Sequence, residues 1–159
     1  MRTLGTAAIV CSALAWSACG GRRPVEINPE AQAAGTLWHA TLGTPAAMAG
    51  ALQVRGSAWM GASEKDSTQT MAHVEISNAP PGGKHPWHVH LGQCGQDRGI
   101  LGPADAYPPL DVKDDGTAKE DATLPLPMPK QGQYFVNVHA AANNMGTIIA
   151  CGNMAPQAR

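Results

Sequence analysis

The strongest constraint on the fold is the two-residue spacing of apolar side chains, which begins near residue 37 and recurs along the chain. Apolar and polar side chains alternate in residues 51–62, 71–79 and 133–141, and residues 146–154 form a short, mostly apolar run. This alternation is typical of β-strands with one buried face. No stretch keeps an apolar stripe with helical spacing over ten residues. The sequence therefore predicts an all-β fold.

Turn signals separate the predicted strands. Clusters of Pro, Gly, Asn, Asp or Lys occupy residues 78–83, 114–117, 127–133 and 143–146, and such clusters favour turns. About eight short antiparallel strands without covering helices predict a Greek-key β-sandwich or barrel. In the alternating segments, the side chains predicted to face the core are Leu52, Val54, Ala58, Met60, Ala72, Val74, Ile76, Val136, Val138 and Ala140.

The start of the chain is predicted to be an export signal. Arg2 is the only charged residue before residue 22, and the apolar run of residues 4–15 is too short to cross a bilayer. Small residues precede Cys19 and two glycines follow it, which resembles a bacterial lipoprotein signal. In such signals the cysteine carries the lipid and becomes the first mature residue. Trp16 departs from the usual aliphatic residue, and an ordinary cleaved signal is the alternative.

The lipoprotein interpretation predicts three segments. Residues 1–18 are the signal peptide, residues 19–36 are a small, polar, Pro-containing tether, and residues 37–159 are one folded domain. The protein is then exported to the periplasm and attached by its lipid to a bacterial membrane, expected to be the outer membrane. The lipid is the only predicted contact with the membrane.

The four cysteines fit this interpretation. Cys11 lies in the removed segment and Cys19 carries the lipid, so Cys94 and Cys151 remain as a pair in an exported protein. In that setting disulfides form and persist, so a disulfide between them is predicted. The alternative is two buried free thiols.

The low charge limits the possible partners and functions. The net charge is −1, 14% of the residues are charged, and Lys and Arg form no block, which argues against nucleic acid. The chain has one Phe and two Tyr, so a large aromatic ligand cavity is not predicted. The sequence has no nucleophile elbow and no helical zinc-hydrolase motif, so a hydrolase is not predicted either.

Half of the six histidines lie in the segment HPWHVH, residues 85–90. If the end of this segment is a strand, His88 and His90 project together from its outer face. The side chains on its core face would be Trp87, Val89 and Leu91. The alternation in residues 133–141 turns His139 outward as well. If the two strands are neighbours, three imidazoles meet on one outer patch.

Three neutral imidazoles suit copper or zinc and can leave an open position for a small ligand. An HxH pair alone is a weak signal, and histidines without a metal at a polar strand end are the alternative. His85 is separated from the strand by Pro86 and is expected to make a structural hydrogen bond. His39 and His73 are expected to be solvated. Five aspartates are expected to be solvated turn residues, and one of them could orient a histidine. They are Asp97, Asp105, Asp111, Asp114 and Asp115.

Two segments resemble motifs of the copper–zinc superoxide dismutases. HPWHVHLGQC (85–94) is similar to that family's H-G-F-H-V-H…G…C segment. FVNVHAAANNMGTIIACGNM (135–154) is similar to its last part, where a strand ends in V-x-H and a later strand carries A-C-G. The similarity extends over most of residues 50–154. The resemblance implies a Greek-key sandwich with a copper site.

The resemblance also assigns roles to individual residues. It implies that His88, His90 and His139 are three of the family's four copper ligands. His85 matches a structural histidine, and the two cysteines match the family's intrasubunit disulfide. Between Cys94 and Val138 there is no histidine, whereas the family places there the imidazole that bridges copper to zinc and two further zinc ligands. One copper ion and no zinc are therefore expected.

A guiding cation is also missing. The family has an arginine three residues before its last disulfide cysteine, where it guides superoxide to copper, and Ile148 stands at that spacing here. Arg98 and Lys84 are candidates to replace it. Without a guiding cation the encounter with the anion is expected to be slower.

Two functions follow from the sequence. One is a copper-dependent superoxide dismutase without zinc, which converts superoxide to oxygen and hydrogen peroxide. The other is a non-enzymatic copper carrier, storage or delivery protein on the same fold, working with a copper-delivery partner. Thioethers favour Cu(I), so a contact between Met145 or Met154 and the histidines would support carriage, unless both are apolar fillers. A third possibility keeps the fold without any metal.

Overall fold

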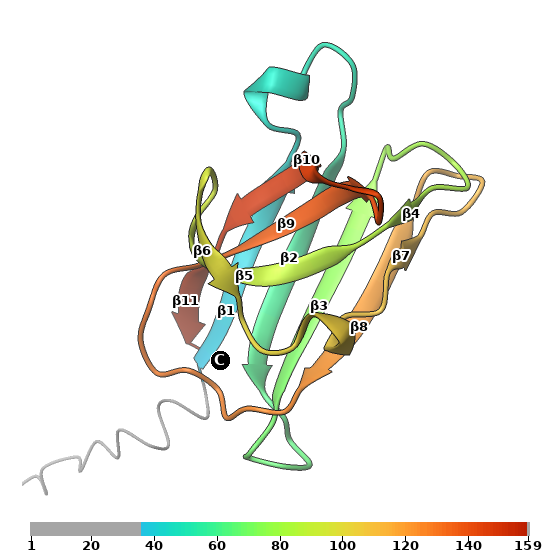
Figure 1. Ribbon diagram of the computed structural model, residues 1–159. Coiled ribbons are helices and arrows are strands. Elements are labelled where there is room, and N and C mark those ends of the chain that lie inside the picture. Colours follow the sequence, from blue (N-terminus) through green and yellow to red (C-terminus); the bar gives the residue numbers. More distant parts are fainter. Residues whose placement is uncertain (1–35, 159) are drawn as a thin grey trace, which may run out of the picture.

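A computed structural model describes residues 36–158 as an almost entirely β-stranded domain (Figure 1). The predicted signal peptide, the lipidation site at Cys19 and the tether up to residue 35 lie outside the described residues. The strands of the main sheet are β1 (Thr36–Gly43), β2 (Arg55–Ala62), β3 (Thr70–Ser77), β5 (Trp87–Gln93), β6 (Gln96–Ile100), β8 (Ala118–Leu124), β9 (Tyr134–Ala141), β10 (Asn144–Asn153) and β11 (Ala155–Ala158). The other elements are the paired strands β4 (Lys84–His85) and β7 (Leu110–Asp111) and the 3-10 helices η1 (Ala46–Met48) and η2 (Ala104–Ala106).

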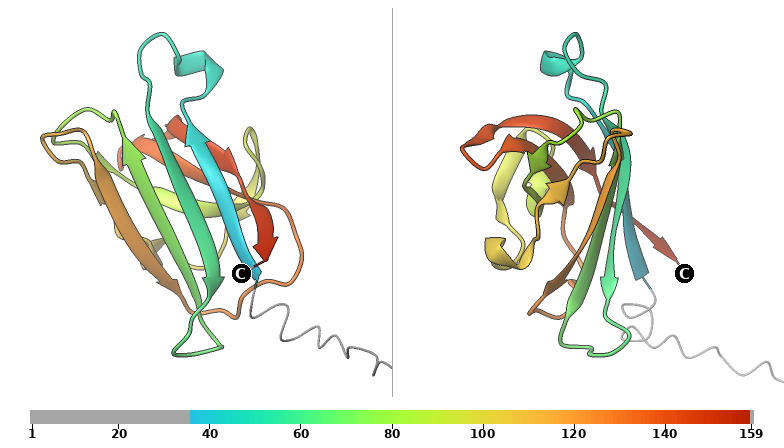
Figure 2. Two further views of the ribbon diagram at one scale, coloured as in Figure 1. Left: turned by 180° about the vertical axis from the view of Figure 1, so that it is seen from behind. Right: turned by 90° about the vertical axis from the view of Figure 1, so that its right-hand side faces the viewer.

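The main sheet is antiparallel and curls into a half-barrel. Its strand order is β6-β5-β9-β10-β1-β2-β3-β8, and β11 pairs with β1. Figure 2 shows two facing walls, one containing β1, β2, β3 and β8 and the other containing β5, β9 and β10. The prediction of an antiparallel all-β barrel or sandwich is confirmed. Among the described residues, no helix is long and apolar enough to cross a membrane.

The core lies between the two walls and follows the predicted alternation. On β3, Ala72, Val74 and Ile76 are buried, and between them lie His73, which is partly buried, and the exposed Glu75. The other predicted core residues that are buried are Val54, Ala58, Met60, Val136 and Val138, whereas Leu52 and Ala140 are partly buried.

Strands β5 and β9 are buried on both faces, which the sequence did not predict. The expectation that their histidines project onto an exposed patch was wrong, because His88, His90 and His139 are 5%, 3% and 5% exposed. Aromatic rings cover the histidine face: Phe135 stacks on His90, and Tyr107 makes a T-shaped contact with His88.

Leu91 departs from the predicted core face of β5. It is 36% exposed, while Trp87 and Val89 on the same strand are fully buried. It lies between His90 and Gly92, where the pairing of β5 with β6 shifts register. The buried core face of β5 therefore ends at Val89 rather than at Leu91.

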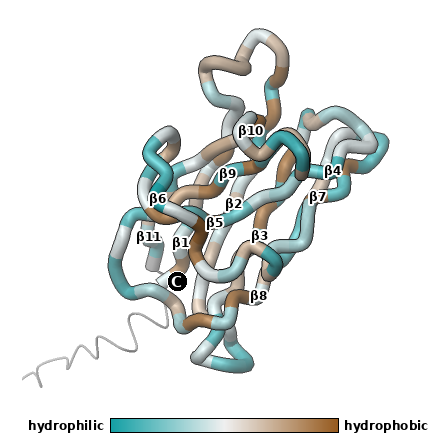
Figure 3. The backbone as a smooth tube through the Cα atoms, viewed as in Figure 1, coloured by the Kyte–Doolittle hydropathy of each residue, from teal (hydrophilic) through white to brown (hydrophobic). Residues whose placement is uncertain are grey.

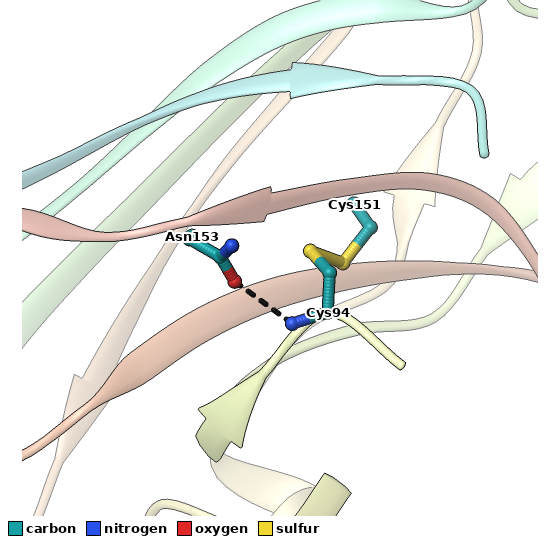
Figure 4. The surroundings of a disulfide bond; sticks show 3 residues. All are labelled: Cys94, Cys151 and Asn153. Carbon is teal, nitrogen blue, oxygen red and sulfur yellow. Dashed lines mark hydrogen bonds between the residues drawn. A yellow bond between two sulfur atoms is a disulfide. The ribbon is translucent and has the colours of Figure 1, made fainter. Parts of the chain in front are cut away.

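The predicted disulfide is confirmed. Cys94, in the turn between β5 and β6, is bonded to Cys151 on β10, 57 residues away in the sequence (Figure 4). The backbone N–H of Cys94 also donates a hydrogen bond of 2.8 Å to Oδ1 of Asn153. The hairpin of β5 and β6 is thus fixed to a strand beyond its neighbour β9.

Candidate metal centre

Three histidines come together where β5 pairs with β9. His88 and His90 share one face of β5, and His139 lies on the same side of β9. Each offers one ring nitrogen, and these nitrogens lie within 4.8 Å of one another. His88 Nδ1 and His139 Nε2 lie 3.3 Å apart. Within residues 36–158 this is the one group of three or more His, Cys, Asp or Glu side chains placed to hold a metal ion.

The outer hydrogen bonds of two histidines leave the lone pairs of their inner nitrogens turned toward the centre of the group, where His139 Nε2 meets His88 Nδ1. His139 Nδ1 lies 2.6 Å from the backbone carbonyl oxygen of Met145. Because a carbonyl only accepts, Nδ1 carries the hydrogen and the Nε2 lone pair is available. His90 Nδ1 likewise lies 3.0 Å from Oδ1 of Asp97, and His90 Nε2 is buried without a hydrogen-bond partner. Metal-binding histidines are commonly oriented in this way by a carbonyl or a carboxylate.

Asp97 is the residue that orients His90. It lies on β6 rather than in the turn that the sequence predicted, but its side chain is half exposed, as expected, and it is the aspartate that orients a histidine. Its Oδ1 accepts hydrogen bonds from His90 Nδ1 and, at 2.7 Å, from the backbone N–H of Gly99. Burial raises the pKa of the Asp97 carboxyl, but these hydrogen bonds and the nearby His90 and His139 outweigh it and lower the pKa. Asp97 is therefore a carboxylate at neutral pH.

Replacing Asp97 with Asn is expected to weaken metal binding. The amide can still bond to His90, but it brings no negative charge and can select the wrong ring tautomer. Loss of such an outer partner typically lowers metal affinity by about 10–100-fold. Competition with a chromophoric chelator measures the affinity, and Asp121→Asn, which alters the similar pair His73–Asp121 on other strands, is the control. Equal affinities for both variants would contradict the role of Asp97.

Two of the three histidines are neutral at neutral pH. The pKa of His88 is lowered from 6.5 to about 4, first because burial disfavours the charged ring and then because His139 and His90 lie beside it. Burial also lowers the pKa of His139, although its hydrogen bond to Met145 opposes the shift. A neutral imidazole is the form that binds a metal ion.

The metal-free protein is expected to lose stability as the pH falls from 6.5 to about 4. In this window His88 stays neutral in the folded chain but takes up a proton in the unfolded chain, so acid favours unfolding. The shift from 6.5 to about 4 corresponds to a loss of up to about 3 kcal/mol. Denaturant unfolding at several pH values measures the loss. The variant His88→Asn should lack that part of the pH dependence, and an unchanged pH dependence would contradict the assignment.

His85 lies beside the three-histidine group but faces elsewhere. Its Nδ1 is 2.9 Å from the carbonyl oxygen of Ala140 and 3.1 Å from that of His139. This ring therefore connects β4 to β9. On its other side, a Cβ on Gly83 would lie 2.5 Å from His85 Nε2, so only glycine fits there without a shift.

An open groove of about 950 Å³ lies beside the histidines. It is called the His139 groove here because His139 is the one member of the group among its lining residues. The loop between β1 and β2 forms one side, the β9–β10 hairpin forms another, and the disulfide and Asp97 lie along it. The groove gives small molecules or ions a route to the histidines.

The other residues that the sequence singled out lie elsewhere or differ in exposure. Lys84 pairs with Asp111 on the surface, and neither Lys84 nor Arg98 lines the His139 groove. Met145 lines the groove and is 37% exposed, whereas Met154 is buried in the core. The ring of His73 bonds to Asp121 and stacks on Trp59, and His39 is partly buried.

Sequence reasoning missed Phe135, Tyr107, Met48 and the specific role of Asp97. A hairpin turning at Cys94 and Gly95 would have aligned Asp97 with the end of the histidine strand, and the glycine there is a turn signal. No sequence signal places Tyr107 or Met48, because both lie at the ends of single-turn 3-10 helices within loops. No protein-family model and no curated protein matches the chain.

Proposed function

We propose that the protein is a copper-dependent superoxide dismutase of a kind that lacks zinc, exported and attached to a bacterial membrane by its lipid. The observation that carries the proposal is the buried group of three histidines with ring nitrogens within 4.8 Å of one another. The two dismutase-like segments of the sequence support it, because the residues they share with that family are the ones that meet in this group.

The donor set fits copper. It consists of imidazoles alone, because both cysteines of the domain are joined in the disulfide and offer no thiolate. Imidazole nitrogens suit copper and zinc, and copper supplies a centre that changes between two oxidation states. The Nε2 of His90 is buried without a partner, which is costly and supports a ligand here because, unlike the similarly unpartnered Nε2 of His85, it belongs to the three-histidine group.

Side chains and backbone groups of the protein would bind the metal, orient the ligand histidines and admit the substrate. Asp97 and the carbonyl of Met145 hold the hydrogens of His90 and His139 on their outer nitrogens. The His139 groove admits a diatomic anion from solvent. In dismutation one superoxide loses an electron to give oxygen, and a second gains it and two protons to give hydrogen peroxide. The protons would come from solvent through the groove, because the lowered pKa values keep His88 and His139 neutral, without the imidazolium proton that could be donated.

Pulse radiolysis of the copper-loaded protein tests this function. The expected result is a superoxide decay rate far above that of His139→Ala loaded in the same way, and the difference should persist with a chelator in solution. A rate equal to that of the variant, with copper still bound, would contradict the enzymatic function. A failure to bind copper would contradict both the dismutase and the carrier.

Replacing Ile148 with Arg is expected to raise the superoxide decay rate. Ile148 lines the His139 groove and pairs with His139 across β9 and β10. Asp97, which is negative, is the one charged side chain among the described lining residues, so the lining offers no charge that attracts an anion. A guanidinium at position 148 would attract superoxide. The expected gain is about tenfold at low salt, the lower end of electrostatic steering, and it should shrink as salt is added. The uncharged variant Ile148→Gln is the control, and an equal gain from both substitutions would contradict steering.

The second candidate function is a copper carrier on the same fold. The exposed thioether of Met145 in the groove favours it, as does the absence of a cation from the described groove lining. A carrier would bind copper as tightly but would leave the superoxide decay rate unchanged. The same radiolysis experiment therefore separates the two functions.

A further inference from the structure

Copper has to reach histidines that are almost completely covered. The three rings are at most 5% exposed. Of the three, only His139 contributes to the lining of the groove. The His139 groove therefore offers a route from solvent to the candidate ligand nitrogens.

The lining of the groove suits a soft cation. Asp97 is the one charged side chain among the described lining residues, and it is negative. Two thioethers line the groove from different segments: Met48 belongs to η1 in the loop between β1 and β2, and Met145 lies in the β9–β10 hairpin. Thioethers favour Cu(I), whereas imidazole is the better ligand for zinc and for Cu(II).

Met145 is not a filler of an apolar gap. It is 37% exposed, whereas Met60 and Met154 are 0% and 7% exposed and pack in the core. Its backbone is fixed next to the site, because its carbonyl oxygen accepts the hydrogen bond from His139 Nδ1. An exposed, flexible thioether on a residue that touches a ligand histidine is well placed to pass an ion onward.

The loop that carries Met48 is uncharged and mostly apolar. It projects from one end of the domain (Figure 1), and Figure 3 shows mostly white to brown colours along it. Between Gly43 and Gln53 it has no Lys, Arg, Asp or Glu. Met48 is therefore the main metal-binding side chain that this loop offers to the groove.

We propose that copper is loaded as Cu(I) through the His139 groove, where the thioethers of Met48 and Met145 bind it in transit to the three histidines. The inference rests on the proposed copper site and adds the oxidation state and the route of loading. Asp97 attracts the cation to the groove, and His139 is the first imidazole it meets. The methionines act on the rate of loading and are not among the final ligands.

Anaerobic stopped-flow mixing with the Cu(I)–bicinchoninate complex tests the route. The double variant Met48→Leu/Met145→Leu should take up copper at least about tenfold more slowly, comparable with the lower end of what local attraction adds to on-rates. Its final stoichiometry and affinity should equal those of the unchanged protein. The matched control is Met71→Leu/Met154→Leu, which removes two thioethers outside the groove lining and preserves volume.

Each outcome decides the proposal. The route is supported if Met48→Leu/Met145→Leu takes up copper slowly while the control variant takes it up as fast as the unchanged protein. Equal rates for all three proteins would overturn the route while leaving the copper site intact, and a lost affinity in the groove variant would make the methionines permanent ligands. If the unchanged protein takes up no Cu(I), the route is overturned; if it also fails to bind Cu(II), the proposed function fails with it.

Discussion

Replacing His90 with Ala is expected to abolish tight copper binding. The change removes one of three ligand nitrogens and also leaves Asp97 without its partner. Loss of an outer partner alone costs up to about 100-fold in metal affinity, so loss of the ligand itself should cost more than about 100-fold. Competition with a chelator of known affinity measures the loss, and circular dichroism verifies that the variant is folded.

A second histidine provides a matched control for this prediction. His73 lies on β3 in the opposite wall and, like His90, has its Nδ1 bonded to an aspartate, with a distance of 2.7 Å to Asp121 Oδ1. It belongs to no metal-binding group among the described residues. His73→Ala should therefore bind copper as the unchanged protein does. Equal losses in the two variants would show that copper binds elsewhere or without specificity.

Removing the disulfide is expected to have the largest effect on stability. The bond between Cys94 and Cys151 closes a loop with a sequence separation of 57 residues. The chain-entropy relation assigns such a loop about 4 kcal/mol. The double variant Cys94→Ser/Cys151→Ser should therefore lose roughly 3–4 kcal/mol of unfolding free energy, and its Tm should fall by roughly 10–15 °C. Urea and thermal unfolding measure these losses.

The disulfide also holds part of the candidate metal centre. Cys94 begins the turn that leads to β6, and β6 carries Asp97. Copper affinity should therefore fall in the double Ser variant as well. Asn153→Ala is the control, because it removes only the hydrogen bond to the Cys94 N–H and should cost about 1 kcal/mol. A double Ser variant no less stable than Asn153→Ala would contradict the contribution of the covalent link.

Much of the fold was accessible from the sequence because alternation reports which face of a strand is buried. On β3 the alternation identified the buried Ala72, Val74 and Ile76 correctly. It also placed His88 and His90 on one face. The alternation does not report what covers the opposite face, and on β5 that face is covered by Phe135 and Tyr107.

The candidate site was predictable in its ligands and not in its surroundings. The sequence grouped His88, His90 and His139 on the condition that their strands are neighbours, and the pairing of β5 with β9 meets that condition. The contact of Asp97 with His90 depends on where the β5–β6 hairpin turns and on a register shift within it. The His139 groove depends on the path of an irregular loop, which no periodic pattern encodes.

X-ray absorption spectroscopy of the protein loaded with one equivalent of copper tests the three-histidine site most directly. The proposed copper site predicts three imidazole nitrogens bound to each copper ion, no sulfur ligand in either oxidation state, and loss of one imidazole in His90→Ala. A sulfur ligand, fewer than three imidazoles in the unchanged protein, or an identical spectrum for His90→Ala would contradict a copper site formed by His88, His90 and His139.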